Sequence, residues 1–128
     1  MKLRAVLFDF DDTLTVPGGL DYGAIRNEMG CPEEESILDF LDGIEGTQTR
    51  RLAEDVLDRH EMAGAARAVA AAGAEELVGW LISASFKTGI LTRNTKAAVL
   101  RSLENFSAIG QSDFDPIIPR DDDLRVKP

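Results

Sequence analysis

Short apolar runs bounded by turn residues mark three strands along the chain. Residues 4–10 (RAVLFDF) are rich in Val, Leu and Phe, and this pattern is typical of a strand that is covered on both faces in a parallel sheet. Residues 87–92 (KTGILT) and 114–118 (FDPII) have the same character, and Pro116 is acceptable at a sheet edge or at a strand start. The three segments predict the strands of one sheet.

The stretch between the first two strands has a different period. Residues 21–84 carry apolar positions at helical spacing, without a convincing strand or an internal repeat. Start and stop signals predict a series of helices: one from Asp21 that ends at Gly30, one that opens at Pro32, a long one from Leu52 to Ala72, one from Ala74 to Ser85, and one from Lys96 to Asn105 that is capped by Asn94 or Thr95. A helical insert therefore interrupts the strand pattern.

This order of elements predicts an α/β fold with a parallel sheet and one all-helical insertion. We expect residues 1–16 and 85–128 to form the α/β part, and residues 17–84 to form the insert. In such sheets ligands bind beyond the carboxyl ends of the strands, so the residues that follow 4–10 and 87–92 are the first candidates for a functional site.

Composition narrows the class of protein. The chain has 128 residues, of which 44% are hydrophobic, and this is enough for one soluble domain with a core. Its net charge of -9 argues against a nucleic-acid partner. The lone cysteine, Cys31, excludes an internal disulfide and fits a reducing cytoplasm. We expect no signal peptide, because the first apolar run meets acids by Asp9. We expect no membrane span, because the Ala-rich stretch from Ala63 to Ala74 contains Arg67 and is far shorter than the roughly 20 residues that a span needs.

The residues with the clearest chemistry are the acids of Asp9-Phe10-Asp11-Asp12-Thr13, directly after the first strand. Because side chains alternate along a strand, Asp9 and Asp11 point the same way. Two carboxylates at one strand end repel each other, and a hard cation such as Mg²⁺ relieves that repulsion. One carboxylate can attack phosphorus, and the other can move a proton to and from the leaving oxygen.

The run VLFDFDDTLT resembles the first signature of the haloacid dehalogenase-like (HAD) superfamily, whose core is a Rossmann-like parallel sheet. Two later segments agree in order. Gly89 to Asn94 (GILTRN) resembles the second signature, a strand that ends in Thr or Ser, and Lys127 before Pro128 resembles the third. The helical insert resembles the small cap of the phosphoglycolate phosphatase-like branch.

The resemblance implies a role for each matched residue. Asp9 is the nucleophile and a magnesium ligand, Asp11 is the acid and base and gives its backbone carbonyl to the metal, and Thr13 supports the loop. Thr92 binds the transferring phosphoryl group together with the neighbouring Arg93 and Asn94. Lys127 neutralises charge on the nucleophile and the phosphate.

The second aspartate discriminates within the superfamily. Dehalogenases lack it, because expelling a halide needs no proton, so Asp11 indicates a phosphatase or a phosphomutase. The resemblance therefore implies a magnesium-dependent phosphatase that forms an aspartyl-phosphate and acts on a small phosphorylated metabolite. Nothing in the sequence identifies that metabolite.

One part of the superfamily pattern has no counterpart here. The fourth signature, one or two acids after a further strand, completes the magnesium site, and Asp121, Asp122 and Asp123 do not fit it because they precede Lys127. We expect a truncated form with low activity, and a complete but inactive copy is the alternative. Truncation would leave the first strand as an exposed edge through which the chain could self-associate.

Other conspicuous residues are expected to be structural. This applies to Cys31, to His60 on a solvated helix position and to Trp80, which is expected to pack its helix on the sheet. Arg93 could reach phosphate or contact the cap, whereas Arg50 and Arg51 fit a solvated helix start better than a substrate clamp.

A response-regulator receiver is the alternative from a different class of protein. It has a similar length, early paired acids, a later Thr at a strand end and a Lys-Pro near the C-terminus. A receiver needs its phosphoacceptor Asp after a buried strand in the middle of the chain, however, and Asp39 and Asp42 lie in a segment with helical spacing.

Overall fold

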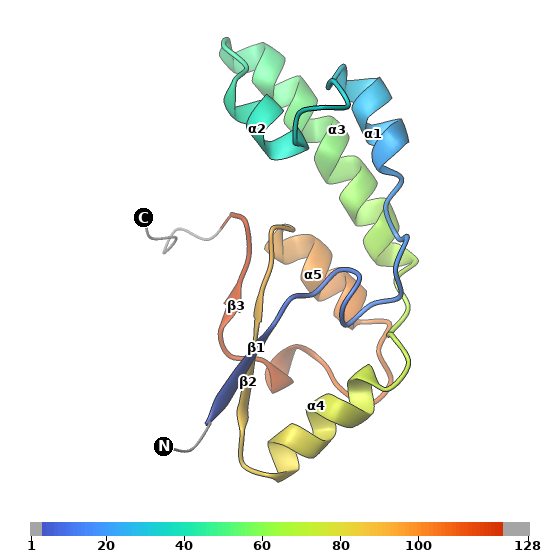
Figure 1. The fold of residues 1–128 in the computed structure, drawn as a ribbon, viewed down its shortest axis with the longest axis vertical. Helices are drawn as coiled ribbons and strands as arrows, with labels where there is room; N and C mark the ends of the chain where they lie inside the picture. The colour runs from blue at the N-terminus through green and yellow to red at the C-terminus, as the bar shows by residue number, and fades with distance from the viewer. Residues whose placement is uncertain (1–3, 122–128) are drawn as a thin grey trace.

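The structure is a computed structural model that describes residues 4–121. Its elements, in chain order, are β1 (Ala5–Phe8), α1 (Tyr22–Met29), α2 (Ile37–Asp42), α3 (Thr47–Ala66), α4 (Ala74–Ser83), β2 (Lys87–Leu91), α5 (Lys96–Leu103), a 3-10 turn η1 (Gln111–Asp113) and β3 (Ile117–Ile118). Figure 1 shows α1, α2 and α3 at one end of the molecule and the sheet with α4 and α5 at the other. The α/β fold with a helical insertion is thus confirmed.

The three strands form one parallel sheet in the order β1-β2-β3. Gly89 lies opposite Leu7, and a Cβ atom at Gly89 would come within 2.7 Å of the Leu7 side chain and of the Pro116 carbonyl. Only glycine fits between these neighbours without a shift. Because the strands are parallel, the loops that follow β1 and β2 leave the sheet at the same edge.

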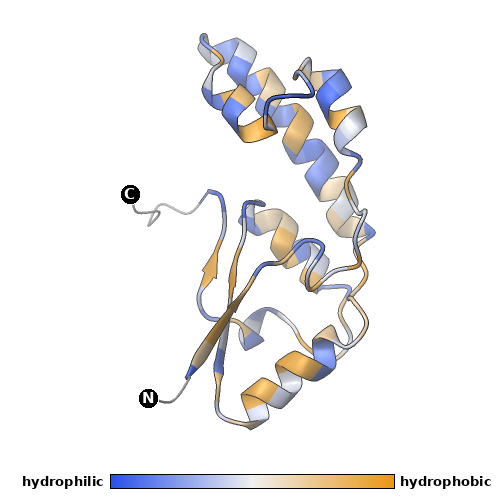
Figure 2. Cartoon of the chain, viewed as in Figure 1, coloured by the Kyte–Doolittle hydropathy of each residue, from blue (hydrophilic) through white to orange (hydrophobic). Residues whose placement is uncertain are grey.

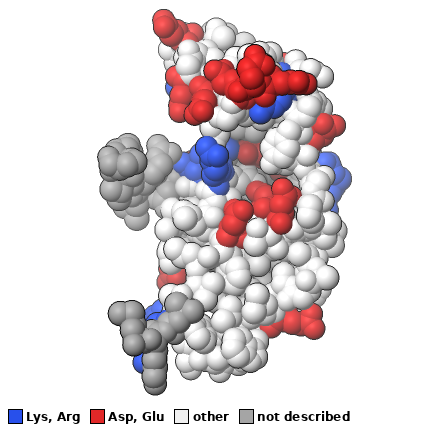
Figure 3. All heavy atoms as spheres, in the orientation of Figure 1, with Lys and Arg blue, Asp and Glu red and all other residues white. Residues whose placement is uncertain are grey.

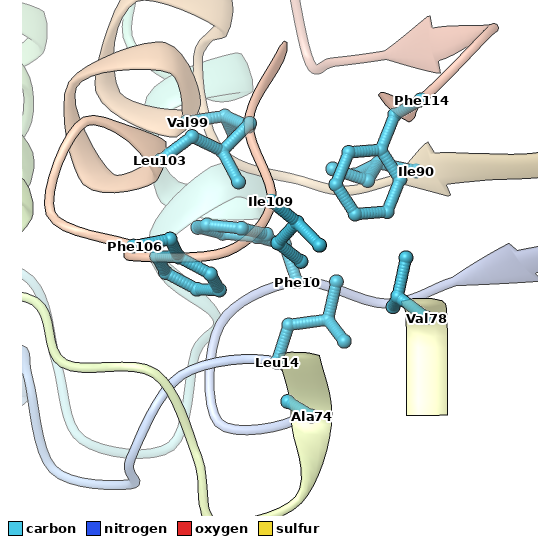
Figure 4. Packing of buried hydrophobic residues seen from close by; sticks show 10 residues of the cluster. All are labelled: Phe10, Leu14, Ala74, Val78, Ile90, Val99, Leu103, Phe106, Ile109 and Phe114. Atoms are coloured by element: carbon cyan, nitrogen blue, oxygen red, sulfur yellow. The ribbon is translucent and has the colours of Figure 1, made fainter. Parts of the chain in front are cut away.

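Helices α4 and α5 cover the same face of the sheet. Their buried side chains share one cluster with Ile90 of β2 and with the fully buried Phe10: Phe10, Leu14, Ala74, Val78, Ile90, Val99, Leu103, Phe106, Ile109 and Phe114 (Figure 4). On the other face Leu7 and Leu91 remain 53% and 52% exposed. The expectation that the first strand is covered on both faces is therefore wrong within residues 4–121.

The edge of β1 that faces away from β2 has no strand partner among the described residues. This is the edge through which self-association was expected. Self-association itself stays a prediction.

The insert has a hydrophobic core of its own. The buried residues that α1, α2 and α3 share with the intervening loop are Ile25, Cys31, Ile37, Leu41, Ala53 and Leu57. Figure 2 shows that these helices carry both hydrophobic and hydrophilic residues, whereas the strands are mainly hydrophobic. Helix α4 lies within residues 17–84 but buries Ala74 and Val78 against the sheet. The expected division at residues 17 and 84 stays a prediction.

The chain leaves α3 at Ala66, although the apolar pattern predicted a helix as far as Ala72. It then runs beside the segment that follows β1: the Val16 N–H donates to Val69 O at 2.8 Å, and the Ala71 N–H donates to Leu14 O at 2.9 Å. These bonds use backbone groups that a longer helix would have needed. The two segments that connect the insert to the sheet are therefore hydrogen-bonded to each other.

Local caps explain the other helix ends. Asp21 accepts a hydrogen bond from the Ala24 N–H, Gly30 ends α1 in the left-handed conformation, and Thr95 caps α5, all as expected. Helix α2, however, begins after Ser36, which accepts from the Asp39 N–H, and not at Pro32. A serine N-cap satisfies a free helix donor, and this outweighed the proline and the acids before it.

Candidate active site

The loop after β1 is anchored by the aromatic ring between its two acids. Phe10 is fully buried in the sheet cluster, and its carbonyl accepts hydrogen bonds from the Thr13 N–H at 3.1 Å and from the Leu14 N–H at 2.8 Å. Asp9 and Asp11 flank it and line the same cavity. The alternation expected of a strand thus continues past the end of β1, and it turns both carboxylates away from the core.

A tight turn holds the rest of the loop. Asp12 has a positive φ of 65°, its N–H donates to Thr15 Oγ1 at 3.0 Å, and its carboxylate accepts from the Gly18 N–H at 3.3 Å. Thr15 is buried, whereas Thr13 is exposed. The threonine that supports the loop through its side chain is therefore Thr15, although Thr13 was expected.

The end of β2 brings a second set of polar groups to the same place. Thr92 is buried, and its hydroxyl accepts from the Asn94 N–H at 3.1 Å. Asn94 is also buried, and its side chain donates from Nδ2 to Asp11 Oδ2 at 2.8 Å and accepts from the Thr95 N–H at 2.7 Å. Asn94 thus links the β2 loop to the β1 loop across 83 positions of sequence.

These groups line a cavity of about 330 Å³ between the insert and the sheet. Its lining residues are Asp9, Asp11, Asp12, Leu20, Tyr22, Arg26, Ser36, Ile37, Leu38, Leu57, Glu61, Thr92, Arg93, Asn94 and Arg120. Figure 3 shows acidic side chains over the insert and a smaller acidic group midway along the visible face, with basic side chains between them. The cavity combines an acidic floor, guanidinium groups and an apolar wall.

The surroundings of the cavity floor raise the pKa of the Asp11 carboxyl. Burial raises the pKa of the Asp11 carboxyl, the Asn94 amide lowers it in part, and the charges of Asp12 and Asp9 raise it further. On balance the pKa lies above its usual value. The folded protein therefore holds a proton at Asp11 more readily than the unfolded chain does.

We predict that the metal-free Asp11→Asn variant is more stable than the wild type at neutral pH. The pKa of Asp11 is higher in the folded state, so the unfolded state ionises first as pH rises above the usual value of 3.8. Stability is lost over that rise, and asparagine does not suffer this loss. Urea unfolding in EDTA from pH 3 to pH 8 measures the difference, which should grow with pH. A constant or shrinking difference would contradict the raised pKa.

The donor set fits a hard divalent cation only in part. Asp9 and Asp11 line one cavity, and a cation there would offset the charges of Asp12 and Asp9, which add to burial in raising the pKa of Asp11. Within residues 4–121, however, no group of three or more His, Cys, Asp or Glu side chains is placed to hold a metal ion. Mg²⁺ commonly keeps several water ligands, so one or two carboxylates are a usual protein contribution.

The remaining expected site residues have different outcomes. Arg93 is exposed and lines the cavity. Lys127 lies outside the described residues, so its expected role stays a prediction. Asp121 accepts a hydrogen bond from the Lys96 N–H at 3.1 Å, while Asp122 and Asp123 also lie outside the described range.

A buried ion pair on the cavity wall was not predicted. Glu61 of α3 is only 5% exposed, and both of its oxygens accept from Arg120, at 2.8 and 3.0 Å. Arg120 follows β3 at the same sheet edge as Asp9, which was an available signal. Glu61 has charged sequence neighbours, so nothing in the pattern showed that it is buried.

Several other residues settle into structural positions. Cys31 is buried and Arg50 pairs with Asp42 and Glu54 away from the cavity. His60 contacts Glu28 at 3.0 Å. Trp80 is 61% exposed and stacks on Phe86, so the expectation that it packs against the sheet is wrong.

The receiver alternative can be assessed from the fold. Asp39 and Asp42 both lie in α2, and a receiver requires its acceptor at the end of a central strand, so the receiver alternative is contradicted.

Within residues 4–121, none of the helices combines the length and the apolar character needed to cross a bilayer.

Comparison with known proteins supports the resemblance that the motifs suggested. The chain is 32% identical over 130 residues to a haloacid dehalogenase-like hydrolase domain-containing protein of Arabidopsis thaliana. This alignment covers 94% of the chain and 51% of that protein. It is 28% identical over 120 residues to an uncharacterized hydrolase of Saccharomyces cerevisiae, and this alignment covers 93% of the chain and 55% of that protein. The chain thus spans about half the length of these curated relatives.

Other comparisons add less. No protein-family model matches the chain. A solved structure described as a phospho-aspartyl intermediate analogue of phosphoserine phosphatase aligns with a TM-score of 0.45 and 21% identity, over 77% of this chain and 49% of that one. A similarity this low does not bear on function. The sequence relatives therefore carry the conclusion that the chain resembles haloacid dehalogenase-like hydrolases over most of its length.

Proposed function

We propose that the chain carries the nucleophile and the acid–base residue of a haloacid dehalogenase-like phosphatase that hydrolyses a small organic phosphate monoester with Mg²⁺. The observation that supports this most is that Asp9 and Asp11 line one cavity together with Thr92 and with Asn94, which is hydrogen-bonded to Asp11. Its curated relatives are named hydrolases, and they are about twice as long as the aligned region. The activity is therefore proposed for the protein that contains this chain.

In the first step, a carboxylate oxygen of Asp9 forms a bond to phosphorus, and the bond between phosphorus and the ester oxygen breaks. The departing oxygen takes a proton from Asp11, whose raised pKa suits a proton donor. In the second step, Asp11 removes a proton from a water molecule, which attacks the same phosphorus and frees Asp9. Products are an alcohol and inorganic phosphate.

The cavity residues would hold the substrate in line for this attack. Thr92 and the Arg93 side chain lie beside the acids and would contact the phosphoryl oxygens, with Lys127 added on the strength of the motif. A Mg²⁺ held by the Asp9 carboxylate and the Asp11 backbone carbonyl would neutralise charge on the phosphoryl group and leave the Asp11 carboxyl to move the proton. Positioning and charge neutralisation would supply most of the rate enhancement.

The insert would act as the cap that selects the substrate. Its side of the cavity carries Leu20, Leu38 and the Tyr22 ring, and the space of about 330 Å³ is at the small end for ligand sites. A small phosphorylated metabolite fits this volume, whereas a large phosphorylated polymer does not. The apolar wall would exclude water from the reacting groups.

Hydrolysis of p-nitrophenyl phosphate by the protein made from its full coding sequence tests the proposal. We expect release of p-nitrophenol and inorganic phosphate with Mg²⁺, loss of that activity in EDTA, and recovery when Mg²⁺ is restored. Activity that is the same in EDTA would exclude the metal requirement. A failure to hydrolyse this ester or any of a panel of small phosphate monoesters would overturn the proposed function.

A further inference from the structure

Arg120 touches both halves of the cavity at once. Its guanidinium donates two hydrogen bonds to Glu61, at 2.8 and 3.0 Å, and one to Asp58 at 3.3 Å, both on α3 of the insert. The same guanidinium donates to the Arg93 carbonyl at 2.9 Å, and the Arg120 N–H donates to the Asn94 carbonyl at 2.9 Å. One residue thus ties the insert to the loop after β2.

The bonds on the sheet side lead directly to the proposed acid. The Arg120 guanidinium holds the Arg93 carbonyl, and the Arg120 backbone N–H, which every Arg120 variant keeps, holds the Asn94 carbonyl. The guanidinium therefore acts through Arg93 on the turn that carries the Asn94 side chain. That side chain donates to Asp11 Oδ2 at 2.8 Å. The Asn94 amide thus connects the residues that Arg120 holds to the proposed acid.

The bonds on the insert side act near the C-terminal end of α3. At that end, Asn105 donates from Nδ2 to the carbonyls of Ala65, Ala66 and Ala68, and this attachment lies beside the paired connecting segments. Glu61 lies on the cavity wall, one helical turn before Ala65. Arg120 therefore holds the turn of α3 that faces the acids, while Asn105 holds the last turn of α3 and the segment that follows it.

Geometry and burial set this ion pair apart from the surface pairs. The Glu61 and Arg120 side chains are 6% and 21% exposed and meet through two parallel hydrogen bonds, whereas Arg50 is 41% exposed beside acids that are 76% and 47% exposed. A guanidinium–carboxylate pair with two bonds fixes both distance and orientation. An exposed pair does neither to a comparable degree.

We propose that Arg120 is a positioning residue for the proposed phosphatase reaction. It holds Glu61 of α3 on the cavity wall near the acids, and it holds the Asn94 amide against Asp11. This inference rests on the proposed function for its kinetic readout only. The structural consequence can be measured without turnover.

Four variants of the full-length protein separate positioning from simple charge compensation. Arg120→Met removes every guanidinium bond, and Arg120→Lys keeps the charge without the two parallel bonds. The double variant Arg120→Met with Glu61→Leu removes the charge that would otherwise be left unpaired. Arg50→Met is the matched control, because it removes an arginine of the insert that is also paired with acids but does not line the cavity.

Two readouts are needed: kcat and KM for p-nitrophenyl phosphate, and the NMR signals of the Asn94 side-chain amide. We expect Arg120→Met to lower kcat tenfold or more and to shift the amide signals, with a smaller effect for Arg120→Lys and none for Arg50→Met. The double variant should regain the thermal stability of the wild type without regaining kcat or the amide signals.

Recovery of kcat and of the amide signals in the double variant would overturn the proposal, because the pair would then serve only to compensate a buried charge. A kcat within twofold of the wild type in Arg120→Met would also overturn it. If the wild type hydrolyses no phosphate ester, the proposed function fails and the Asn94 signals decide alone: unchanged signals in the double variant refute the positioning role. The double variant also covers the case in which Arg120→Met does not fold.

Discussion

Replacing Asp9 with asparagine is expected to abolish hydrolysis of p-nitrophenyl phosphate by the full-length protein. An amide is a poor nucleophile and forms no stable acyl phosphate, so the covalent route is closed, and the loss should be on the order of 10³-fold or more in kcat. Asp9 is exposed and lines the cavity, and within residues 4–121 its side chain accepts a hydrogen bond from the Phe10 N–H to Oδ1 at 2.9 Å. The substitution should therefore leave the fold intact.

A matched control separates lost chemistry from lost charge. Asp55 is an exposed residue of α3 that does not line the cavity, and Asp55→Asn removes the same formal charge. We expect kcat in Asp55→Asn to stay within about twofold of the wild type, since surface substitutions away from a site have small effects. Undiminished turnover in Asp9→Asn would refute the nucleophile assignment.

Phe10→Ala is expected to cause the largest loss of stability of any single substitution in the loop after β1. Phe10 is fully buried, and it stacks on Phe106 with ring centroids 6.2 Å apart (Figure 4). Truncation of a buried Phe leaves a cavity and costs about 3–5 kcal/mol. That is a large fraction of the roughly 5–15 kcal/mol by which a domain is stable.

Urea unfolding measures this loss as a change in the free energy of unfolding. Leu52→Ala is the control, because Leu52 is 61% exposed on α3, and its truncation should change that free energy by about 0.5 kcal/mol or less. If Phe10→Ala costs less than about 1 kcal/mol, the ring does not anchor the loop. In that case the account of how Asp9 and Asp11 are aimed at the cavity is wrong.

The sequence predicted the positions of helices and strands best where the spacing of the apolar residues agrees with a residue that starts or ends the element. The strand β1 was found because its apolar run stops abruptly at Asp9, and alternation then predicted that Asp9 and Asp11 point the same way. Asp21 was found, and Thr95 was one of two candidates beside Asn94, because a side-chain oxygen before a helical pattern can cap the helix. These features depend on residues that are close in the chain.

Competing local signals explain two misplaced helix ends. Pro32 and the three acids after it are good residues for a first helical turn, yet Ser36 provides the cap, and α2 is shorter than expected. The alanines after Ala66 favour a helix, yet their backbone groups pair with the segment after β1. In the second case a contact between distant segments overrides local propensity.

Pairing between distant segments was beyond the reach of a single sequence. Glu61 and Arg120 are 59 positions apart, and nothing in either neighbourhood shows that one is buried against the other. The Asn94 bond to Asp11 has the same character, because it depends on the β1–β2 register. Of the expected site residues, Asp9, Asp11, Thr92, Arg93 and Asn94 line one cavity, and their chemical roles stay predictions.

Trapping the covalent intermediate tests the central claim most directly. The full-length protein would be mixed with Mg²⁺ and substrate, quenched in acid during turnover, and treated with borohydride, which reduces an aspartyl-phosphate to homoserine. Peptide mass spectrometry then locates the reduced residue. We predict that it is position 9 and that the signal is absent without substrate. Reduction at position 11, or active turnover with no reduced residue anywhere, would contradict the assignment of Asp9 as the nucleophile.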